Sequence, residues 1–382
     1  MSGGVGFGPV SELLAIAEAL ELRGVSPRVV TFSERQSALV EELGFQSTSL
    51  PGPVARMLPV VDYTLSDVFY ANGFTDPRYL SSTVESLCAL IRRDRSDVVV
   101  CVTNPAAVLA ARRLSVASVA LVAGPDLPNF ESPLYERSLY RGRATSDLNA
   151  CLAEMGVGHA SCVEDVVFRW SDGLVAPTWP ELDPVLSSQA EVQFVGPVKS
   201  VGLDLLGGPL PPRDLRNSVV VYLNRGSVNE AEAERILIRC AEWFSEDVVV
   251  WVGGDSTVAR SVDRRILCVG RVPLSRWLNT AKLLVSGGGL VAMLSALERG
   301  VGTLCIPGMN AERFYNGQQF AHLNVAVVSD VHDFDTDRES VLTTQVGGLL
   351  SSDEPKRVSQ GLGRLGGAGR AADIVVEVVS QR

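Results

Sequence analysis

The clearest candidate for chemistry in this sequence is a run of one serine and three glycines, Ser286, Gly287, Gly288 and Gly289. The run follows an apolar stretch and precedes a helical pattern. Glycines at such a turn allow backbone N–H groups to approach an anion, and a helix N-terminus adds about half a positive charge. The run therefore predicts a loop that binds a diphosphate. The plain alternative is a tight strand-to-helix turn without a ligand.

A second glycine-containing loop follows the apolar stretch at 218–223. Gly226 and Ser227 in this loop are placed to approach the same diphosphate from its other side. Arg225 beside them carries a permanent charge on a donor fork that suits phosphate, unless it is an ordinary surface arginine. No DxD-type acidic motif lies near either loop, and no His, Cys and carboxylate cluster has metal-ligand spacing. We therefore expect neither a metal nor a cofactor.

Apolar, β-branched runs alternate with helical patterns along the chain. Helical patterns include 11–22 and 290–299, each with an apolar stripe on one face. Continuous apolar runs are typical of strands that are buried on both faces of a parallel sheet, so the alternation predicts an α/β fold. The apolar runs lie at 97–102, 119–123, 192–195, 218–223, 247–252, 266–269, 282–285 and 303–306.

A Gly- and Pro-rich stretch at 195–213 divides the chain. We expect two Rossmann-like, doubly wound parallel-sheet domains over 1–200 and 201–365, and a closing helix over 366–382 that packs back on the first. Ligands bind at the carboxyl ends of such strands, so two facing sheets would enclose a central cleft. The glycine-rich start at 3–8 reads as the loop after a first strand, and the sequence leaves open whether that strand lies upstream or is lacking.

Charge and composition exclude several classes of protein. The net charge is -10 and the cationic residues are scattered, which argues against a nucleic-acid interface. No apolar run reaches the ~18–20 residues of a transmembrane helix. The seven cysteines are odd in number and lack CxxC spacing, as expected for reduced thiols in the cytoplasm.

Residues 269–316 resemble the donor-binding region of nucleotide-sugar-dependent glycosyltransferases of family 1, the UDP- and dTDP-sugar enzymes of the antibiotic type. The segment contains VGRVPLSRWL, then KLLVSGGGLVAMLSALERGVGTLCIP, and it ends in GMNAERFYN. Weaker similarity follows the family order at 8–24, 194–198, 222–228 and 366–378. The resemblance implies the GT-B fold, with an N-terminal acceptor-binding domain and a C-terminal domain that binds the nucleotide-sugar donor.

The resemblance also implies roles for individual residues. The backbone at 271–273 corresponds to the loop that reads the edge of the nucleobase. Glu312 and Arg313 correspond to the acid and amide that hold the sugar hydroxyls. An arginine in place of the amide departs from the family and indicates either a charged sugar or a salt bridge to Glu312. The implied donor-binding residues are Arg225, Gly226, Ser227, Arg271, Val272, Pro273, Ser286, Gly287, Gly288, Gly289, Glu312, Arg313 and Asn316.

The residues that do proton transfer in the family are missing. Its catalytic histidine corresponds to Pro9, and the aspartate that orients it corresponds to Asn104. Asp126 and Glu131 are the substitutes that we consider, because their loop leaves the run at 119–123. Each is otherwise a solvated loop acid.

Further departures concern the donor site and the histidines. The family's donor-site histidine and its ribose-binding glutamate correspond to Ser286 and Ser295, and Val291 stands where a hydroxyl is expected. The chain has three histidines, all outside these motifs: His159, His322 and His332.

The function predicted from these features is an inverting, metal-independent transfer of a sugar from a dTDP- or UDP-sugar to a small-molecule, natural-product-like acceptor. Loss of the ribose carboxylate favours dTDP. Two alternatives stay open: a catalytically inactive GT-B homologue that acts as a binding or activating partner, and a nucleotide-sugar 2-epimerase. Neither a nucleic acid nor a transmembrane segment is expected, and a homodimer is left open.

Overall fold

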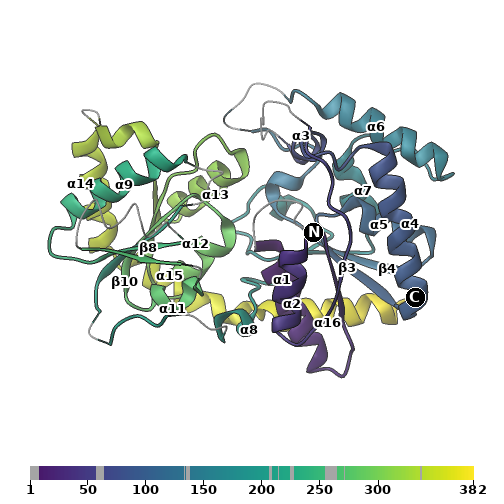
Figure 1. Ribbon diagram of the computed structural model, residues 1–382, viewed down its shortest axis with the longest axis horizontal. Helices are drawn as coiled ribbons and strands as arrows, with labels where there is room; N and C mark the ends of the chain where they lie inside the picture. The colour runs from purple at the N-terminus through teal and green to yellow at the C-terminus, as the bar shows by residue number, and fades with distance from the viewer. Residues whose placement is uncertain are drawn as a thin grey trace. The chain divides into compact units, whose positions relative to one another are not determined.

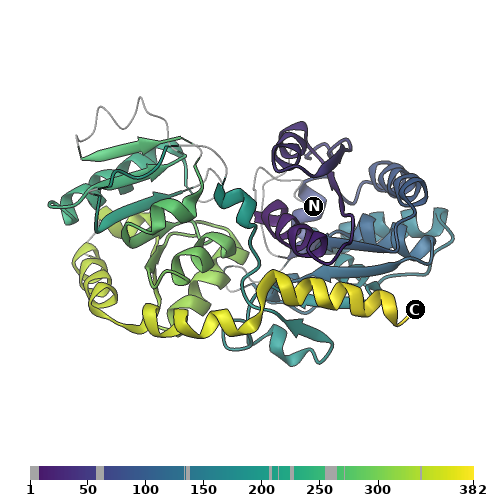
Figure 2. The same cartoon turned by 90° about the horizontal axis from the view of Figure 1, so that it is seen from below.

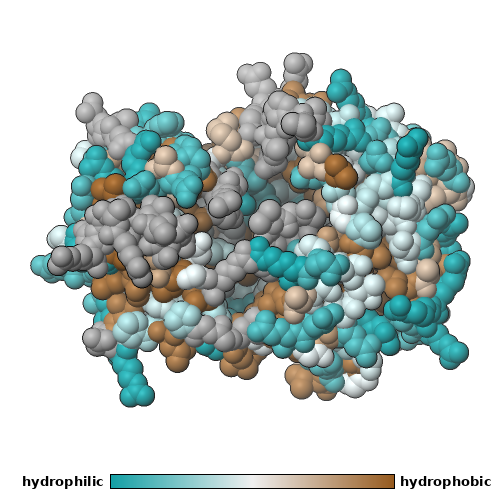
Figure 3. Space-filling model, in the orientation of Figure 1, coloured by the Kyte–Doolittle hydropathy of each residue, from teal (hydrophilic) through white to brown (hydrophobic). Residues whose placement is uncertain are grey.

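The computed structural model describes residues 8–56, 64–132, 134, 138–205, 209–213, 215–223, 228–253, 265–270, 272–335 and 338–382. The chain forms two units. Unit 1 comprises Met1–Ser200 and Leu365–Arg382, and unit 2 comprises Val201–Arg364. None of the described helices is long and apolar enough to span a membrane. On the face drawn in Figure 3, many of the coloured residues are hydrophilic, and the hydrophobic ones form separate patches among them.

Unit 2 contains one six-stranded parallel sheet in the order β12-β11-β10-β7-β8-β9. Its strands are β7 (Ser218–Tyr222), β8 (Val249–Val252), β9 (Ile266–Val269), β10 (Ala281–Ser286), β11 (Gly302–Cys305) and β12 (Ala326–Val328). From β7 the chain winds outward through β8 to β9, and then returns to β10 on the other side and winds outward to β12. This reversal between β7 and β10 is the defining feature of a doubly wound sheet, so the prediction for this unit is confirmed.

Helices cover both faces of this sheet. The described helices of unit 2 are α8 (Val201–Leu205), α9 (Glu230–Trp243), α11 (Leu274–Leu278), α12 (Leu290–Leu297), α13 (Ala311–His322), α14 (Glu339–Ser351) and α15 (Glu354–Leu362). Along β7, Val219 and Val221 pack with α9 and α14, while Val220 packs with α11 and α12 on the opposite face. Burial on both sides explains why the strands are continuous apolar runs.

Unit 1 contains two parallel sheets among its described residues. Four strands pair in chain order: β3 (Val98–Val102), β4 (Ala117–Leu121), β5 (Gly173–Ala176) and β6 (Val192–Phe194). Two more strands, β1 (Arg28–Thr31) and β2 (Gln46–Ser49), pair with each other and with no other strand in the described part of the chain. The sequence predicts a doubly wound parallel-sheet domain here, and the described strands of this unit pair in parallel, as predicted. The predicted glycine loop at 3–8 lies outside the described residues except for Gly8, where the first helix begins.

The helices of unit 1 are α1 (Gly8–Glu21), α2 (Glu34–Glu42), α3 (Leu65–Ala71), α4 (Pro77–Asp94), α5 (Pro105–Arg113), α6 (Arg141–Glu154), α7 (Val163–Trp170) and α16 (Gly367–Ser380). Helix α16 lies against α1 and across β3, β4 and β5 (Figures 1 and 2). Its Ile374 and Val375 share a core with Ile16 of α1 and Val119 of β4. The far end of the chain is therefore an integral part of this unit.

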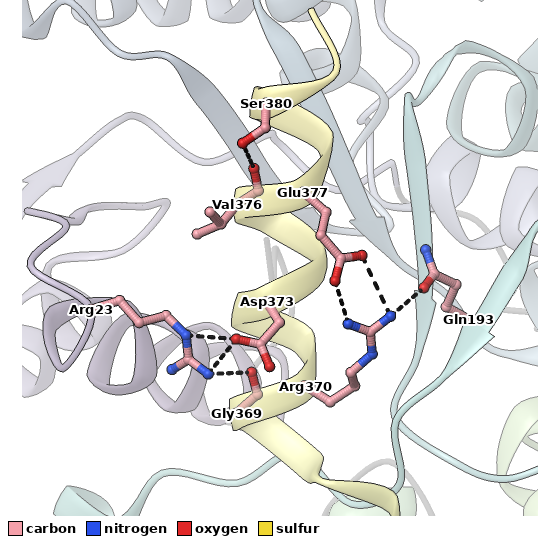
Figure 4. Close-up of polar contacts among 8 residues, drawn as sticks. All are labelled: Arg23, Gln193, Gly369, Arg370, Asp373, Val376, Glu377 and Ser380. Atoms are coloured by element: carbon pink, nitrogen blue, oxygen red, sulfur yellow. Dashed lines mark hydrogen bonds and ion pairs between the residues drawn. The ribbon is translucent and has the colours of Figure 1, made fainter.

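Polar contacts hold both sides of α16 (Figure 4). The Arg23 guanidinium lies 2.6 Å from the Asp373 carboxylate and also donates to the Gly369 carbonyl at 2.9 Å. On the other side, Arg370 pairs with Glu377 at 2.6 Å and donates to the amide oxygen of Gln193. These charged groups are partly exposed, so each ion pair stabilises the position of α16 far less than the burial of its apolar face does.

Candidate functional site

The carboxyl edge of the unit 2 sheet is where a ligand is expected, because the winding reverses there between two hydrogen-bonded neighbours. Tyr222 ends β7 and is the register partner of Ser286, which ends β10. Cys305 ends β11 and pairs with Ser286 from the other side. The predicted residues Arg225, Gly226, Ser227 and Arg271 lie outside the described part of the chain.

The serine–glycine loop links β10 to α12 by a turn that only glycine adopts easily. Gly288 has φ +83°, in the left-handed region. The Ser286 hydroxyl is buried and accepts a hydrogen bond from the Gly288 N–H at 3.3 Å, so this side chain stabilises the turn. Gly289 is the N-cap of α12 and provides no side-chain cap. The first N–H groups of α12 therefore need acceptors from elsewhere, as in a phosphate-binding loop.

Helix α13 is packed tightly against this loop. A Cβ on Gly288 would lie 2.7 Å from the Arg313 carbonyl oxygen, 2.9 Å from the Arg313 Cβ and 3.0 Å from the Cys305 Sγ. The buried Asn316 amide donates to the Gly288 carbonyl at 3.2 Å. Three of the residues predicted from the sequence, Gly288, Arg313 and Asn316, thus meet in one interlocked contact.

Two consecutive charged residues near the start of α13 differ in their exposure to solvent. The Asn310 side chain caps the helix by accepting from the Arg313 N–H at 2.9 Å. Glu312 is exposed, whereas Arg313 is partly buried. Burial raises the pKa of the Cys305 thiol to about 12 and also raises the pKa of the Tyr222 phenol, and the positive charge of Arg313 opposes both rises. The Arg313 charge therefore acts on the side chains at the ends of both β7 and β11.

Val272 and Pro273 form the turn between β9 and α11, and Pro273 is the N-cap of α11. Strand β9 lies three places from β10 on the same edge, a separation of roughly 14 Å at the usual strand spacing. Such a separation suits an extended nucleotide better than a single small anion. That this turn contacts a nucleobase stays a prediction. Ser295 donates to the Val291 carbonyl one turn earlier in α12, so its hydroxyl is used within its own helix.

In unit 1, Asp126 lies at the carboxyl edge of the four-stranded sheet. It ends the short 3-10 helix η1 (Gly124–Asp126) that follows β4. Its carboxylate accepts from the Ala123 N–H at 2.9 Å and from the Thr103 hydroxyl at 3.3 Å. Thr103 follows β3 and has φ +44°. This backbone conformation is strained for a β-branched residue, so the surrounding structure must hold it in place. Glu131 is exposed further along the same loop.

The positions that replace the family's catalytic pair have structural roles. Pro9 lies in the first turn of α1. Asn104 is buried, and its side-chain oxygen caps α5 by accepting from the N–H groups of Ala106 and Ala107. All three histidines are exposed. Within the described ranges, no three His, Cys, Asp or Glu side chains lie close enough together to hold a metal ion.

Sequence reasoning missed three residues at these edges. Tyr222 and Cys305 were the next-to-last residues of the predicted runs at 218–223 and 303–306, and Thr103 followed the run at 97–102 without an evident motif. The only sequence feature that marked them was position, since each lies at or just after the end of an apolar run. The carboxyl edge of a parallel sheet makes such positions worth testing.

Comparisons with known proteins give a consistent architecture. No protein-family model matches the sequence, and no curated protein matches it. A glycosyltransferase of kitacinnamycin is similar in structure, with a TM-score of 0.72, 18% identity, and coverage of 96% of this chain and 94% of that one. The calicheamicin glycosyltransferase CalG4 also has a TM-score of 0.72, with 20% identity and coverage of 98% and 96%.

A third solved structure, the glycosyltransferase VinC in complex with dTDP, has a TM-score of 0.64, 16% identity, and coverage of 97% of both chains. Identities this low describe architecture only. In each case the alignment covers nearly the whole of both chains, so the similarity includes both units. The chain therefore has the α/β fold, with parallel sheets in two domains, of GT-B glycosyltransferases.

Proposed function

We propose that this protein transfers a sugar from a dTDP- or UDP-sugar to a small-molecule, natural-product-like acceptor. The observation that carries the proposal is the interlock of Gly288 with Arg313 and Asn316 at the point where the unit 2 sheet reverses its winding. Left-handed glycines also occur at ordinary turns of this chain. What fixes this loop is the Asn316 amide donated from another helix and the close packing of Arg313, and a fixed loop can present backbone N–H groups to an anion.

In this proposal each part of the edge has a role. The Gly289 N–H and the first N–H groups of α12 bind the diphosphate, while the Ser286 hydroxyl holds the Gly288 N–H. The turn at Val272 and Pro273 contacts the base, and the exposed Glu312 accepts hydrogen bonds from sugar hydroxyls. The VinC structure holds dTDP, which supports a pyrimidine nucleotide as the ligand class. Unit 1 binds the acceptor.

The proposed reaction is a single displacement with inversion. The acceptor oxygen attacks the anomeric carbon while the bond to the diphosphate oxygen breaks, and the electron pair leaves with the diphosphate. Backbone N–H groups and the N-terminal end of α12 stabilise the charge that develops on the leaving group. No metal is required in this scheme.

The acceptor must lose its proton as the new bond forms, and a positioned base contributes roughly 10²–10⁴-fold to such a step. Asp126 is the described carboxylate that we propose for this role. It is held by the Ala123 N–H and the Thr103 hydroxyl at the edge of the unit 1 sheet.

A donor-binding protein without transferase activity is the second candidate. The observation that favours it is that Asn104 caps α5 and Pro9 belongs to α1, so neither position offers a proton acceptor. Such a protein would bind the same nucleotide and act on a partner enzyme.

One experiment separates these functions. The full-length protein is heated with UDP, dTDP and, as a control, GDP, and nucleotide release from UDP- and dTDP-sugars is followed with a panel of phenol and alcohol acceptors, with and without EDTA. A ligand at 100 times its Kd adds about 2.7 kcal/mol of stability. We expect a higher Tm with a pyrimidine diphosphate and turnover that EDTA does not abolish. The absence of a shift with both UDP and dTDP would refute the donor site, and binding without turnover would favour the second candidate.

A further inference from the structure

Asp183 is a buried acid of unit 1 that has no role in the reaction as described so far. Only 3% of its surface is exposed. It lies in the loop after β5, where one carboxylate oxygen accepts from the Leu186 N–H at 3.2 Å, at the start of the short 3-10 helix η2 (Leu186–Ser188). The other oxygen accepts from the Gly124 N–H at 2.8 Å, in the loop after β4. Burial of a carboxylate is costly unless hydrogen bonds satisfy it, so these two bonds stabilise Asp183 where it lies.

Gly124 begins the turn that carries Asp126. The Asp126 N–H donates to the Ala123 carbonyl at 2.9 Å, and the Leu127 N–H donates to the Gly124 carbonyl at 3.1 Å. The Ala123 N–H in turn donates to the Asp126 carboxylate at 2.9 Å. The turn is therefore closed on itself, and a rotation of the peptide between Ala123 and Gly124 would displace the Asp126 carboxylate.

Three contacts attach this part of the chain to the rest of unit 1. The Val122 N–H donates to the Val175 carbonyl at 2.9 Å and continues the pairing of β4 with β5. The Arg141 guanidinium donates to the Pro128 carbonyl, just after the turn. Asp183 provides the contact between these two, at the residue next to the one whose N–H holds the carboxylate proposed as the base. The Asp183 bond therefore acts on the turn itself, whereas the other two hold the chain on either side of it.

We propose that Asp183 is a positioning residue that fixes the direction of the Asp126 carboxylate. The inference rests on the proposed function, in which Asp126 removes the acceptor proton. Asp183 touches neither substrate in this scheme and acts through the Gly124 N–H. A general base must lie within hydrogen-bond reach of the proton that it removes, and a displacement of about 1 Å lowers the rate by about 10²-fold.

The main variant for the test is Asp183→Ser. A serine hydroxyl still accepts from the Leu186 N–H as a cap, but it is too short to reach the Gly124 N–H as well. Asp183→Asn keeps the shape of the side chain and one oxygen, so it should lose less. The matched control is Asp172→Ser. Asp172 accepts from the Ser118 N–H at 2.8 Å near the other end of β4, so this variant also removes a bond from a carboxylate to the backbone.

Nucleotide release from the donor is measured with an acceptor identified by screening, and calorimetric titration gives the Kd of UDP and dTDP. We expect Asp183→Ser to lower kcat by about 10- to 100-fold, while the nucleotide Kd and the acceptor KM stay within about threefold of wild type. Asp183→Asn should fall between the two. Asp172→Ser should keep kcat within about twofold of wild type at a similar loss of Tm.

A double substitution separates positioning from a general loss of structure. If Asp183 acts through Asp126, then adding Asp183→Ser to Asp126→Asn lowers kcat no further, because the two losses are not independent. Thermal unfolding of each variant checks the fold, and Asp183→Asn carries the same comparison if Asp183→Ser does not fold.

Three results would overturn the inference and leave the proposed function intact. They are a wild-type kcat in Asp183→Ser, an equal loss of kcat in Asp172→Ser, and a loss of kcat by Asp183→Ser that is as large with Asp126→Asn as without it. A wild-type protein that binds neither UDP nor dTDP, or that binds without turnover, would instead refute the proposed transferase and the inference with it.

Discussion

Substituting Gly288 by alanine is the sharpest test of the interlocked loop. A left-handed backbone costs a residue with a Cβ about 1–2 kcal/mol. The new methyl group would also lie 2.7 to 3.0 Å from the Arg313 carbonyl, the Arg313 Cβ and the Cys305 sulfur. Overpacking of this kind costs about 1–3 kcal/mol. We expect a total loss of about 2–5 kcal/mol, together with displacement of α13 from the loop.

Two measurements check this expectation. The Tm should fall by about 4–20 °C, at roughly 2–4 °C per kcal/mol for a domain of this size. Affinity for UDP or dTDP should fall at least tenfold in the protein that remains folded, because Arg313 and Asn316 both shift.

Gly300→Ala is a matched control just beyond the opposite end of α12. Gly300 also has a positive φ, +66°, and its nearest neighbour is the flexible side chain of Lys356. It should cost about 1–3 kcal/mol and leave nucleotide affinity unchanged. Wild-type affinity in Gly288→Ala, or an equal loss of affinity in Gly300→Ala, would refute the assignment of this loop to the donor.

Three further predictions concern proton transfer and unit 1. Asn104→Ala should lose about 1 kcal/mol in urea unfolding because it removes the cap of α5, whereas Asn104→Asp should keep the stability, since aspartate caps equally well; equal losses in both would contradict the capping role. With an acceptor identified by screening, Asp126→Asn should lower kcat by ~10²-fold or more at unchanged nucleotide affinity, and Thr103→Val should lower it by about tenfold while Thr103→Ser restores it; an unchanged kcat in Asp126→Asn would remove this base. Replacement of any single histidine by glutamine should change kcat by less than about threefold, and the pH profile should lack an inflection near ~6.5; a thousandfold loss would show that the base is one of His159, His322 and His332.

The strands of the parallel sheets were largely predictable from the sequence. The run at 218–223 became β7 (Ser218–Tyr222), and the run at 266–269 became β9 (Ile266–Val269). Burial on both faces requires such runs, so the pattern and the structure have the same cause. Strands β1, β2, β5 and β12 lie outside the predicted runs. The residues of β2, Gln46–Ser49, are polar and only partly buried, so they give no apolar signal. The predicted linker at 195–213 also contains the short helix α8, which has no buried residue.

The candidate site was predictable only in part. Gly288, Arg313 and Asn316 could be named because they occupy motif positions, but their mutual contact depends on how α13 docks on the sheet. Thr103 could not be found in this way, since a left-handed threonine results from the tertiary structure and local preference opposes it. Contacts between distant segments are the part that a single sequence does not reveal.

Helix α16 affects the order in which the two units can fold during synthesis. Unit 1 needs residues from both ends of the chain, and Val201–Arg364 is synthesised in between. A ribosome adds ~5–20 residues per second, so this stretch takes roughly 8–33 s. During that time Ile16, Val119 and Val175 lack the helix that covers them. Unit 2 is continuous in sequence, so a chain truncated before Leu365 should contain all of unit 2 and a unit 1 that lacks α16.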